Sequence, residues 1–288
     1  MKLSVVIVSY KSDHLLEKIL KDFSKKHEII IIENSLQAST KKNIEKKYSN
    51  AKVIIPPTNL GYAAAFNLGF KRSKNQFVLT LAPDVLINKK LIFDIEKLLN
   101  SFKNFTLLSP EYKNKKIYKN FIPIENLKNQ SKISKYRVEE VKDLDWCFCI
   151  INKSKFKNKK ILDENFFLYF ETTDLCKNLF KQNKKMYVVK NLKFDHLGTG
   201  SSNKKYNSEI QFNRNWHFCW SKFYLLKKNY GYLFALKKLL PNIFQSIIGI
   251  LASAFKLNIF EIKLHFSSLM GTINGIILNK SHYRPNIK

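Results

Sequence analysis

Two short segments of the chain combine residue types whose spacing suits ligand chemistry. In residues 59–70, Asn59, Gly61 and Asn67 belong to a glycine turn that runs into a small-residue helix, where a bulky ligand can approach the backbone. The second segment is an apolar strand, residues 77–81, that stops at Pro83 and delivers Asp84 at its end. Because open α/β sheets bind ligands at the carboxyl ends of their strands, these segments together predict a nucleotide-sugar and metal site.

The first 110 residues alternate short apolar strands with helical stretches. This alternation predicts an α/β fold, a mostly parallel sheet with helices on both faces. Residues 111–142 are basic and weakly patterned, and we expect a loop excursion there. Further strands are expected at 145–151, 166–170 and 186–189, a helix at 172–182, and a polar loop at 194–202. The earlier strands are expected at 5–9, 28–32, 52–55 and 77–81, and the helices at 14–23, 39–48, 61–72 and 89–102.

The C-terminal region changes character. Residues 239–255 and 264–279 contain no Lys, Arg, Asp or Glu, and lysines flank both stretches. Each is shorter than the ~20 apolar residues that a spanning helix needs. We therefore expect helices that lie in a membrane interface, with a helical appendage packed on the main domain as the alternative. The predicted domains are residues 1–230 and a helical C-terminal region, residues 231–288.

The charge of the chain is strongly positive. Lys and Arg together number 51 against 22 Asp and Glu, a net charge of +29, and only four of the 51 are arginines. Lysine-dominated charge suits diffuse attraction to an anionic membrane surface, whereas readers of nucleic acid usually depend on arginine. We therefore expect no nucleic-acid partner, and an overall compositional bias remains an alternative explanation of the charge.

The start of the chain and its cysteines bear on where the protein resides. The N-terminus lacks the apolar length and cleavage site of a signal peptide, which predicts a cytoplasmic protein. The four cysteines, Cys147, Cys149, Cys176 and Cys219, lack metal-binding spacing and are expected to be reduced thiols.

Six motifs in a fixed order resemble glycosyltransferase family 2, with its GT-A fold, and especially a rhamnosyltransferase-like bacterial branch. The resemblance covers roughly residues 3–230. The motifs are residues 6–10 (VIVSY), 32–35 (IENS), 59–69 (Asn-Leu-Gly through Asn67 and Gly69), Pro83-Asp84, residues 162–175 (LDENFFLYFETTDL), and His196 with Gly198 and Ser201.

The resemblance implies a sugar donor carried on UDP or dTDP and a divalent metal, Mg²⁺ or Mn²⁺. Asp84 stands at the family's metal and diphosphate position, and His196 is the matching second metal candidate. Many members have two aspartates where this chain has Ala82 and Asp84, so only one carboxylate remains. Hard divalent cations prefer oxygen ligands, and the diphosphate supplies some of them.

Other residues at family positions are implied to bind the donor. Glu33 stands where the family's aspartate contacts the nucleotide base, and its extra methylene changes the reach of the carboxylate. The complete implied donor set is Ser9, Tyr10, Glu33, Asn34, Asn59, Gly61, Asn67, Asp84 and Arg214. For each of these residues a purely structural role, such as strand-end polarity or helix capping, is the alternative.

The catalytic base is implied by the motif that follows the aromatic run 166–170. The family's usual aspartate is replaced here by Thr172, which cannot accept a proton at neutral pH. Glu171 follows an apolar stretch, where desolvation would raise its pKa toward that of a base. Asp174 is expected in the first turn of a helix, which favours its charged form. Glu171 is the preferred candidate and Asp174 the second.

The resemblance implies an inverting glycosyltransferase, and the charge and apolar C-terminal stretches predict that it is peripheral to the inner face of the cell membrane. Its acceptor would be a hydroxyl of a cell-surface saccharide, lipid-linked or of lipooligosaccharide type. Two alternatives remain. One is a catalytically impaired membrane-surface binding protein on the same fold, marked by Ala82 and Thr172. The other is a basic nucleic-acid-binding protein, which no recognisable motif supports.

Overall fold

The computed structural model describes residues 1–113, 119–125, 130–197 and 206–285. Contacts divide the chain into two compact units. The first comprises Met1–Leu60, Ala64–Leu162 and Thr172–Asn203, and the second comprises Gly61–Ala63, Asp163–Glu171 and Lys204–Lys288. The predicted boundary at residue 230 differs from this division, because the last long helix before it packs with the C-terminal helices.

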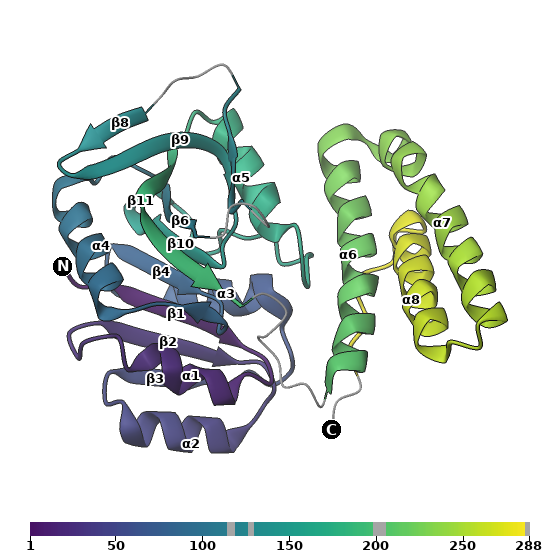
Figure 1. The fold of residues 1–288 in the computed structure, drawn as a ribbon, viewed down its shortest axis with the longest axis horizontal. Coiled ribbons are helices and arrows are strands. Elements are labelled where there is room, and N and C mark those ends of the chain that lie inside the picture. Colours follow the sequence, from purple (N-terminus) through teal and green to yellow (C-terminus); the bar gives the residue numbers. More distant parts are fainter. Residues whose placement is uncertain (114–118, 126–129, 198–205, 286–288) are drawn as a thin grey trace. The chain divides into compact units, whose positions relative to one another are not determined.

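The first unit is built on a sheet whose N-terminal half is parallel (Figure 1). Strand β1 (Ser4–Ser9) pairs in parallel with β2 (Glu28–Glu33) on one side and with β4 (Phe77–Leu81) on the other. Strand β3 (Ala51–Ile54) extends the sheet beyond β2, also in parallel. The order β3-β2-β1-β4 therefore brings the carboxyl ends of the predicted strands to one edge, as the sequence pattern indicates.

The second half of the sheet is mixed. Strand β10 (Phe148–Asn152) is antiparallel to β4 and to β6 (Leu107–Tyr112), whereas β11 (Met186–His196) is parallel to β6. Strand β9 (Tyr136–Leu144) lies antiparallel along β11. Three short strands complete the sheet: β5 (Val85–Leu86) on β11, and β7 (Phe121–Pro123) and β8 (Gln130–Ile133) on β9.

Three sequence expectations after residue 110 are wrong. Residues 111–142 contain strands, because Tyr136, Val138 and Val141 are buried and anchor β9 in the sheet despite the surrounding lysines. Residues 166–170, which belong to the second unit, contain bends and no strand, although a strand was expected there. The strand expected at 186–189 extends to His196, so part of the expected loop is sheet, while residues 198–202 of that loop lie outside the described residues.

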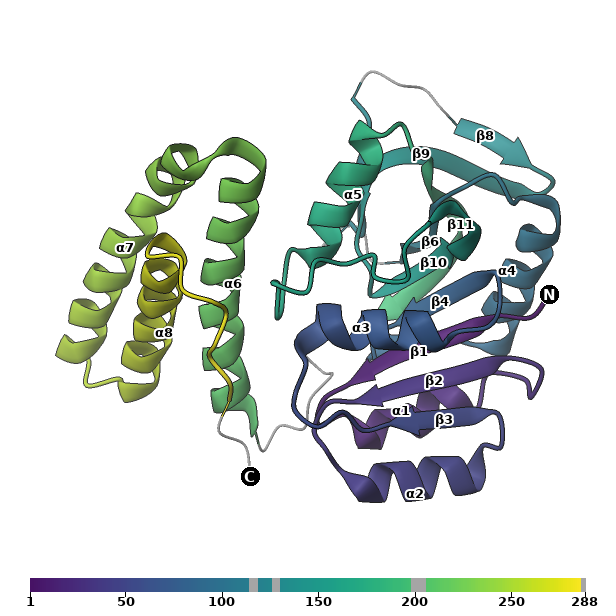
Figure 2. The same cartoon turned by 180° about the vertical axis from the view of Figure 1, so that it is seen from behind.

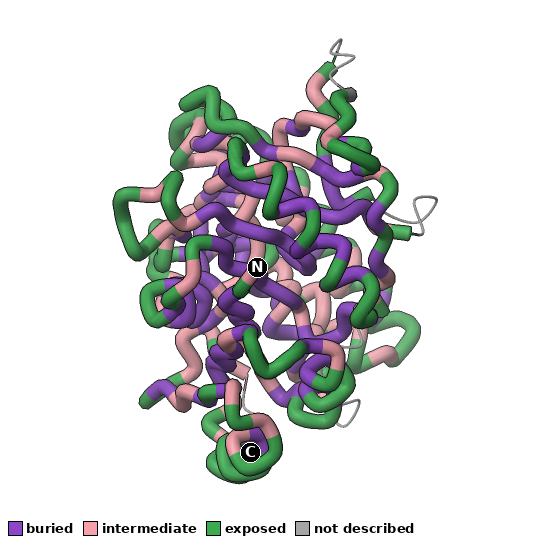
Figure 3. The backbone as a smooth tube through the Cα atoms, turned by 90° about the vertical axis from the view of Figure 1, so that its left-hand side faces the viewer, coloured by how far each residue is buried: buried purple, intermediate pink, exposed green. Residues whose placement is uncertain are grey.

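Helices cover both faces of the parallel strands (Figures 1 and 2). Helices α1 (Asp13–Leu20), α2 (Ala38–Lys47) and α4 (Lys89–Ser101) share one core with Val5 and Ile7 of β1. Helix α3 (Gly61–Arg72) packs on the opposite face, against Val6. Because neighbouring residues of a strand point to opposite faces, an uninterrupted apolar β1 fits burial from both sides. Figure 3 shows this buried backbone near the N-terminus.

All four cysteines are free and buried, as the sequence predicts. Helix α5 (Glu171–Lys181) precedes β11 in the chain, and Cys176 lies on it, fully buried.

The second unit is mainly helical. Helix α6 (Asn207–Tyr230) ends at Gly231, whose φ of 91° lies in the region that favours glycine. Helices α7 (Tyr232–Phe255) and α8 (Ile259–Ile276) pack with α6 and with each other. Helix α8 approaches α6 closely, because a Cβ on Gly271 would lie 2.2 Å from the carbonyl oxygen of Trp216 and one on Gly275 would lie 3.0 Å from Phe223 Cβ.

Helices α7 and α8 have an inverted pattern of burial. The buried positions of α7 are Ala235, Leu239, Ser246 and Ser253, and those of α8 are Ser267, Gly271, Thr272, Asn274 and Gly275. Large apolar side chains instead face outward, Phe255 being 91% and Leu233 79% exposed. Among the described helices, α7 alone is long and apolar enough by length and composition to cross a membrane. The uncharged stretch that seemed too short thus belongs to a 24-residue helix, because α7 continues through Lys237 and Lys238.

The packing of α3 on β1 gives a test of the fold. A Cβ on Gly69 would lie 2.5 Å from Val6 Cγ1, so we expect Gly69→Ala to reduce the free energy of unfolding by about 1–3 kcal/mol through overpacking. In Val6→Ala the obstructing methyl groups are gone, and adding Gly69→Ala should then cost much less. Urea unfolding of the four proteins measures this coupling, and strictly additive losses would contradict the contact.

Candidate active site

Two buried polar side chains meet at the carboxyl ends of β1 and β2. Ser9 and Glu33 are opposite each other in the strand register, and both are 0% exposed. The backbone N–H of Ser35 donates to Glu33 Oε1 at 2.8 Å. Ser9 Oγ and Glu33 Oε2 have no hydrogen-bond partner among the described residues. A buried carboxylate oxygen without a donor is costly, so this pair fits a ligand that presents an N–H or O–H group.

The residues that follow these strands connect them to the glycine turn. Asn34 N–H donates to the carbonyl oxygen of Ser9 at 2.8 Å, and Asn34 Oδ1 accepts from Leu60 N–H at 3.4 Å. This second contact brings the strand end next to the segment that contains Asn59. Burial raises the pKa of Tyr10 to about 12, so its phenol is neutral and can donate a hydrogen bond at neutral pH.

Asp84 and His196 form a pair at the end of β4. His196 Nε2 lies 3.0 Å from Asp84 Oδ1, and Asp84 is only 3% exposed. Antiparallel pairing of β5 with β11 places His196 opposite Val85, and Leu197 N–H donates to the carbonyl oxygen of Asp84 at 3.0 Å. The sequence places these residues 112 positions apart, and the β5–β11 contact brings them together.

Neighbouring charges favour the protonated form of His196. Burial lowers the pKa of His196, but the hydrogen bond and charge of Asp84, helped by the charge of Asp145, outweigh burial and raise it above the ordinary value. Asp145 was not predicted from sequence. Its carboxylate accepts from Cys147 N–H at 2.8 Å, between β9 and β10. Its only sequence signal is its position directly before the apolar run of residues 146–151.

The pair fits a divalent cation in part. Asp84 offers the carboxylate oxygen that Mg²⁺ and Mn²⁺ prefer, and the imidazole of His196 suits Mn²⁺ better than Mg²⁺. The described residues contain no cluster of three or more His, Cys, Asp or Glu side chains that could hold a metal ion. These two side chains could therefore hold a cation only together with oxygens from a ligand such as a diphosphate.

Two residues of the predicted donor set have clear structural functions. Asn67 Oδ1 accepts from the N–H groups of Ile161 and Leu162 at 3.0 and 3.1 Å, and its Nδ2 donates to the carbonyl oxygen of Leu162 at 2.8 Å. Gly61 has φ 74°, and a Cβ there would lie 2.3 Å from the carbonyl oxygen of Phe167. Both residues thus fix distant segments against α3, and no donor contact is needed to explain them.

The two base candidates lie in the first turn of α5. Glu171 and Asp174 are both buried, with 6% and 3% exposure, and Glu171 is assigned to the second unit, whereas Asp174 belongs to the first. Tyr169 and Phe170, directly before Glu171, have φ of 69° and 66°. Two consecutive non-glycine residues in this conformation indicate local strain, a feature that concentrates at functional sites.

Arg214 on α6 lies near this strained turn in the second unit. Burial raises the pKa of the Tyr169 phenol, Arg214 lowers it, and Glu171 raises it. The phenol of Tyr169 therefore lies close enough to interact with the charges of Arg214, which is predicted to bind the donor, and of Glu171, the predicted base. Sequence reasoning did not single out Tyr169, although it belongs to the aromatic run before Glu171.

A comparison with protein families assigns the chain. Residues 4–158, more than half of its length, match the family model described as glycosyl transferase family 2. The chain belongs to glycosyltransferase family 2. The match includes Ser9, Glu33, Asn67 and Asp84, so the resemblance that the motifs suggested is confirmed at the level of the family.

A curated relative comes from Haloferax volcanii. It is described as the low-salt glycan biosynthesis hexosyltransferase Agl10 and is 24% identical over 194 residues, which cover 63% of this chain and 62% of the relative. The match thus spans less than two thirds of that protein's length.

Solved structures share the fold, which confirms the predicted GT-A architecture. TarS residues 1–349 from S. aureus superposes with a TM-score of 0.53 at 15% identity, covering 95% of this chain and 91% of the other. The mannosyltransferase PcManGT from Pyrobaculum calidifontis, in complex with GDP-Man and Mn²⁺, has a TM-score of 0.56 at 10% identity, with 95% and 86% coverage.

The Asp84–His196 pair predicts a measurable change in protonation. In Asp84→Asn the charge that raises the pKa of His196 is lost, so we expect burial to dominate and the pKa to fall below that of free histidine. Titration of the imidazole C–H signals by NMR measures it. Asp195→Asn is the matched control, since Asp195 precedes His196 directly in sequence but pairs with Lys113 at 3.3 Å. An equal fall in both variants would contradict the assignment.

Proposed function

We propose that this protein transfers a hexose or deoxyhexose from a nucleoside-diphosphate sugar to a hydroxyl of a cell-surface saccharide. Membership of glycosyltransferase family 2 supports the reaction class. The observation that carries the proposal is the set of polar groups at the ends of β1, β2 and β4: Ser9 Oγ and Glu33 Oε2, buried without partners among the described residues, and Asp84 beside His196.

Each of these groups would contact a different part of the donor. Glu33 Oε2 can accept the ring N–H that uracil and thymine both present, which supports UDP or dTDP as carrier. Asp84 and His196 would hold Mg²⁺ or Mn²⁺ together with the diphosphate, and the cation would stabilise negative charge on the leaving group. The curated hexosyltransferase relative supports a hexose, while the rhamnosyltransferase-like branch, and with it a deoxyhexose, stays a prediction.

The proposed transfer is a single displacement with inversion. Glu171 accepts the proton of the acceptor hydroxyl, the hydroxyl oxygen forms a bond to the anomeric carbon, and the bond to the nucleoside diphosphate breaks with its electrons. Burial of Glu171 supports this assignment, because desolvation favours the neutral form and so makes a carboxylate a better base. Asp174 is the second candidate. Thr172 beside them has no acidic group to contribute.

We further propose that the protein works at the cytoplasmic face of the membrane, where a lipid-linked acceptor would be found. Large side chains of α7 recur at spacings of three, four and seven residues and so form one outward stripe. Small residues inside and large apolar residues outside are typical of helices packed in lipid. Lys237, Lys238 and Lys256 accompany the stripe and suit anionic headgroups. The stripe comprises Leu233, Leu240, Phe244, Ile247, Ile248, Leu251 and Phe255.

Donor binding tests the proposed reaction. We expect calorimetry with a panel of UDP-, dTDP- and GDP-sugars to show binding of a UDP- or dTDP-sugar that Mn²⁺ strengthens at least tenfold. Asp84→Asn should remove the effect of Mn²⁺, whereas Asp195→Asn should retain it. Glu171→Gln should lower turnover at least a hundredfold with donor affinity nearly unchanged, as expected for a general base. No binding across the panel would favour the impaired-enzyme alternative.

Vesicle binding tests the membrane face. We expect the full chain to sediment with anionic vesicles, and Leu251→Glu with Phe255→Glu to weaken this at least tenfold, because each places a charge where an apolar contact with lipid is lost. Phe93→Glu is the control, since Phe93 on α4 of the first unit is also an exposed aromatic residue (54%). Equal weakening by the control, or undiminished binding of the double variant, would refute the proposal.

A further inference from the structure

The second unit contains a cavity of about 260 Å³ that none of the predicted donor, metal or base residues lines. It lies between α6, the segment that follows α8, and residues 164–165, all within that unit. Its volume is just below the ~300–1,000 Å³ of sites for drug-sized ligands, so it suits a single sugar unit better than a nucleotide. The residues that characterise it are Asn165, Trp220, Tyr224, Lys227, Asn279 and Lys280.

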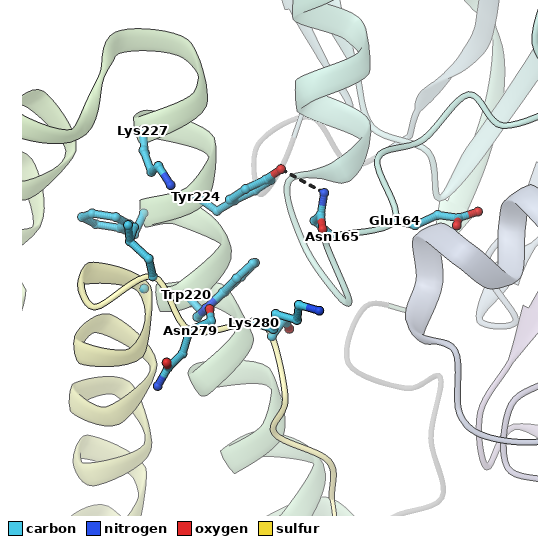
Figure 4. Close-up of a pocket in the computed structure, with 11 residues that line it drawn as sticks. Glu164, Asn165, Trp220, Tyr224, Lys227, Asn279 and Lys280 are labelled. Atoms are coloured by element: carbon cyan, nitrogen blue, oxygen red, sulfur yellow. Dashed lines mark hydrogen bonds between the residues drawn. The ribbon is translucent and has the colours of Figure 1, made fainter.

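An aromatic wall forms one side of the cavity. Trp220 and Tyr224 stack with ring centroids 5.3 Å apart and planes 16° apart, and Figure 4 shows both projecting from α6 toward the segments that contain Asn165 and Lys280. Tyr224 accepts from Asn165 Nδ2 at 3.1 Å and donates to Asp163 Oδ2 at 3.0 Å. Aromatic side chains with anchored polar ends offer flat apolar surface, which packs well against the C–H face of a sugar ring.

The opposite side of the cavity is formed by the chain after α8, and hydrogen bonds fix it. Trp220 Nε1 donates to the carbonyl oxygen of Asn279 at 2.9 Å. His217 Nε2 donates to the carbonyl oxygen of Tyr283 at 2.9 Å, and Ser281 Oγ donates to His217 Nδ1 at 3.0 Å. Burial lowers the pKa of His217 to about 3, so the neutral imidazole that this arrangement needs is present at neutral pH. The cavity is therefore formed before any ligand arrives, which reduces the entropy cost of binding.

The charge of the cavity is positive. The ammonium groups of Lys227 and Lys280 have no ion-pair partner among the described residues, whereas the neighbouring Lys228 pairs with Asp163 at 2.7 Å. Glu164 also lines the cavity, but in Figure 4 its carboxylate points away from Lys227 and Tyr224. Lysines beside an aromatic wall favour a ligand with an anionic group, and phosphate offers the charged acceptor oxygens that an ammonium group binds.

We propose that this cavity binds a sugar phosphate, the sugar ring against Trp220 and Tyr224 and the phosphate paired with one of the two lysines that line it, Lys227 or Lys280. The amide nitrogen of Asn165 already donates to Asp163 Oδ1 at 2.8 Å and to the Tyr224 hydroxyl at 3.1 Å, so its carbonyl oxygen is the atom that could accept from a sugar hydroxyl. Use of this cavity as a subsite for a phosphate-bearing unit of the acceptor rests on the proposed glycosyl transfer, whereas the binding itself does not.

Calorimetry with galactose 1-phosphate, galactose and inorganic phosphate tests the proposal on the full chain. We expect galactose 1-phosphate to bind at least tenfold more tightly than either of the other two. The double variant Lys227→Gln/Lys280→Gln should lose at least tenfold in affinity. Lys181→Gln/Lys184→Gln, which removes the same charge from exposed lysines of the first unit, should bind as the wild type does. Asp84→Asn should also bind normally, which separates this cavity from the donor site.

Several results would overturn the proposal. Equal binding of galactose 1-phosphate and inorganic phosphate would show that the aromatic wall recognises no sugar. A loss of affinity in Asp84→Asn but not in Lys227→Gln/Lys280→Gln would assign the binding to the donor site. The two proposals fail separately: sugar-phosphate binding without any nucleotide-sugar binding would refute the glycosyl transfer alone, and the reverse would refute this cavity alone.

Discussion

The parallel pairing of β1 with both β2 and β4 is the constraint on which the candidate donor site depends. It places the ends of these strands side by side, so Ser9, Glu33 and Asp84 lie on one edge of the sheet. The pairing is stabilised by burial of β1 on both faces, with Val5 and Ile7 in one core and Val6 against α3. A loss of packing at α3 would therefore displace the ends of these strands and the polar side chains on them.

The polar groups at these ends are buried at some cost, and this cost distinguishes them from ordinary strand-end polarity. Glu33 is fully buried with one oxygen lacking a partner among the described residues, and Asp84 is retained next to a histidine whose charge it favours. Stability alone would select apolar or fully satisfied side chains here. The burial of these polar groups is best explained by a ligand that completes their hydrogen bonds.

The helical unit differs from the first unit in which residue types it buries and exposes. Its helices pack through Ser, Gly and Thr and expose Leu, Ile and Phe, so the hydrophobic effect that drives the first unit does not organise α7 and α8 in the same way. A lipid surface would compensate for the exposed apolar area. The same unit contains the rigid cavity next to Trp220 and Tyr224, so surface attraction and selective recognition would be combined in one helical element.

The sequence alone determined the α/β class, the family, and the four parallel strands and four helices between residues 4 and 101, because periodicity and motif spacing are local properties. Tertiary structure decided what depends on distant contacts. Pairing of β5 with β11 brings His196 to Asp84, and contacts with residues 161–162 give Asn67 a structural function. Strand β9 forms within the expected loop because β11 supplies it with a partner, and α6 packs with α8 through close contacts at two glycines. Such choices depend on which surfaces meet in space, and no local pattern of residue types records that.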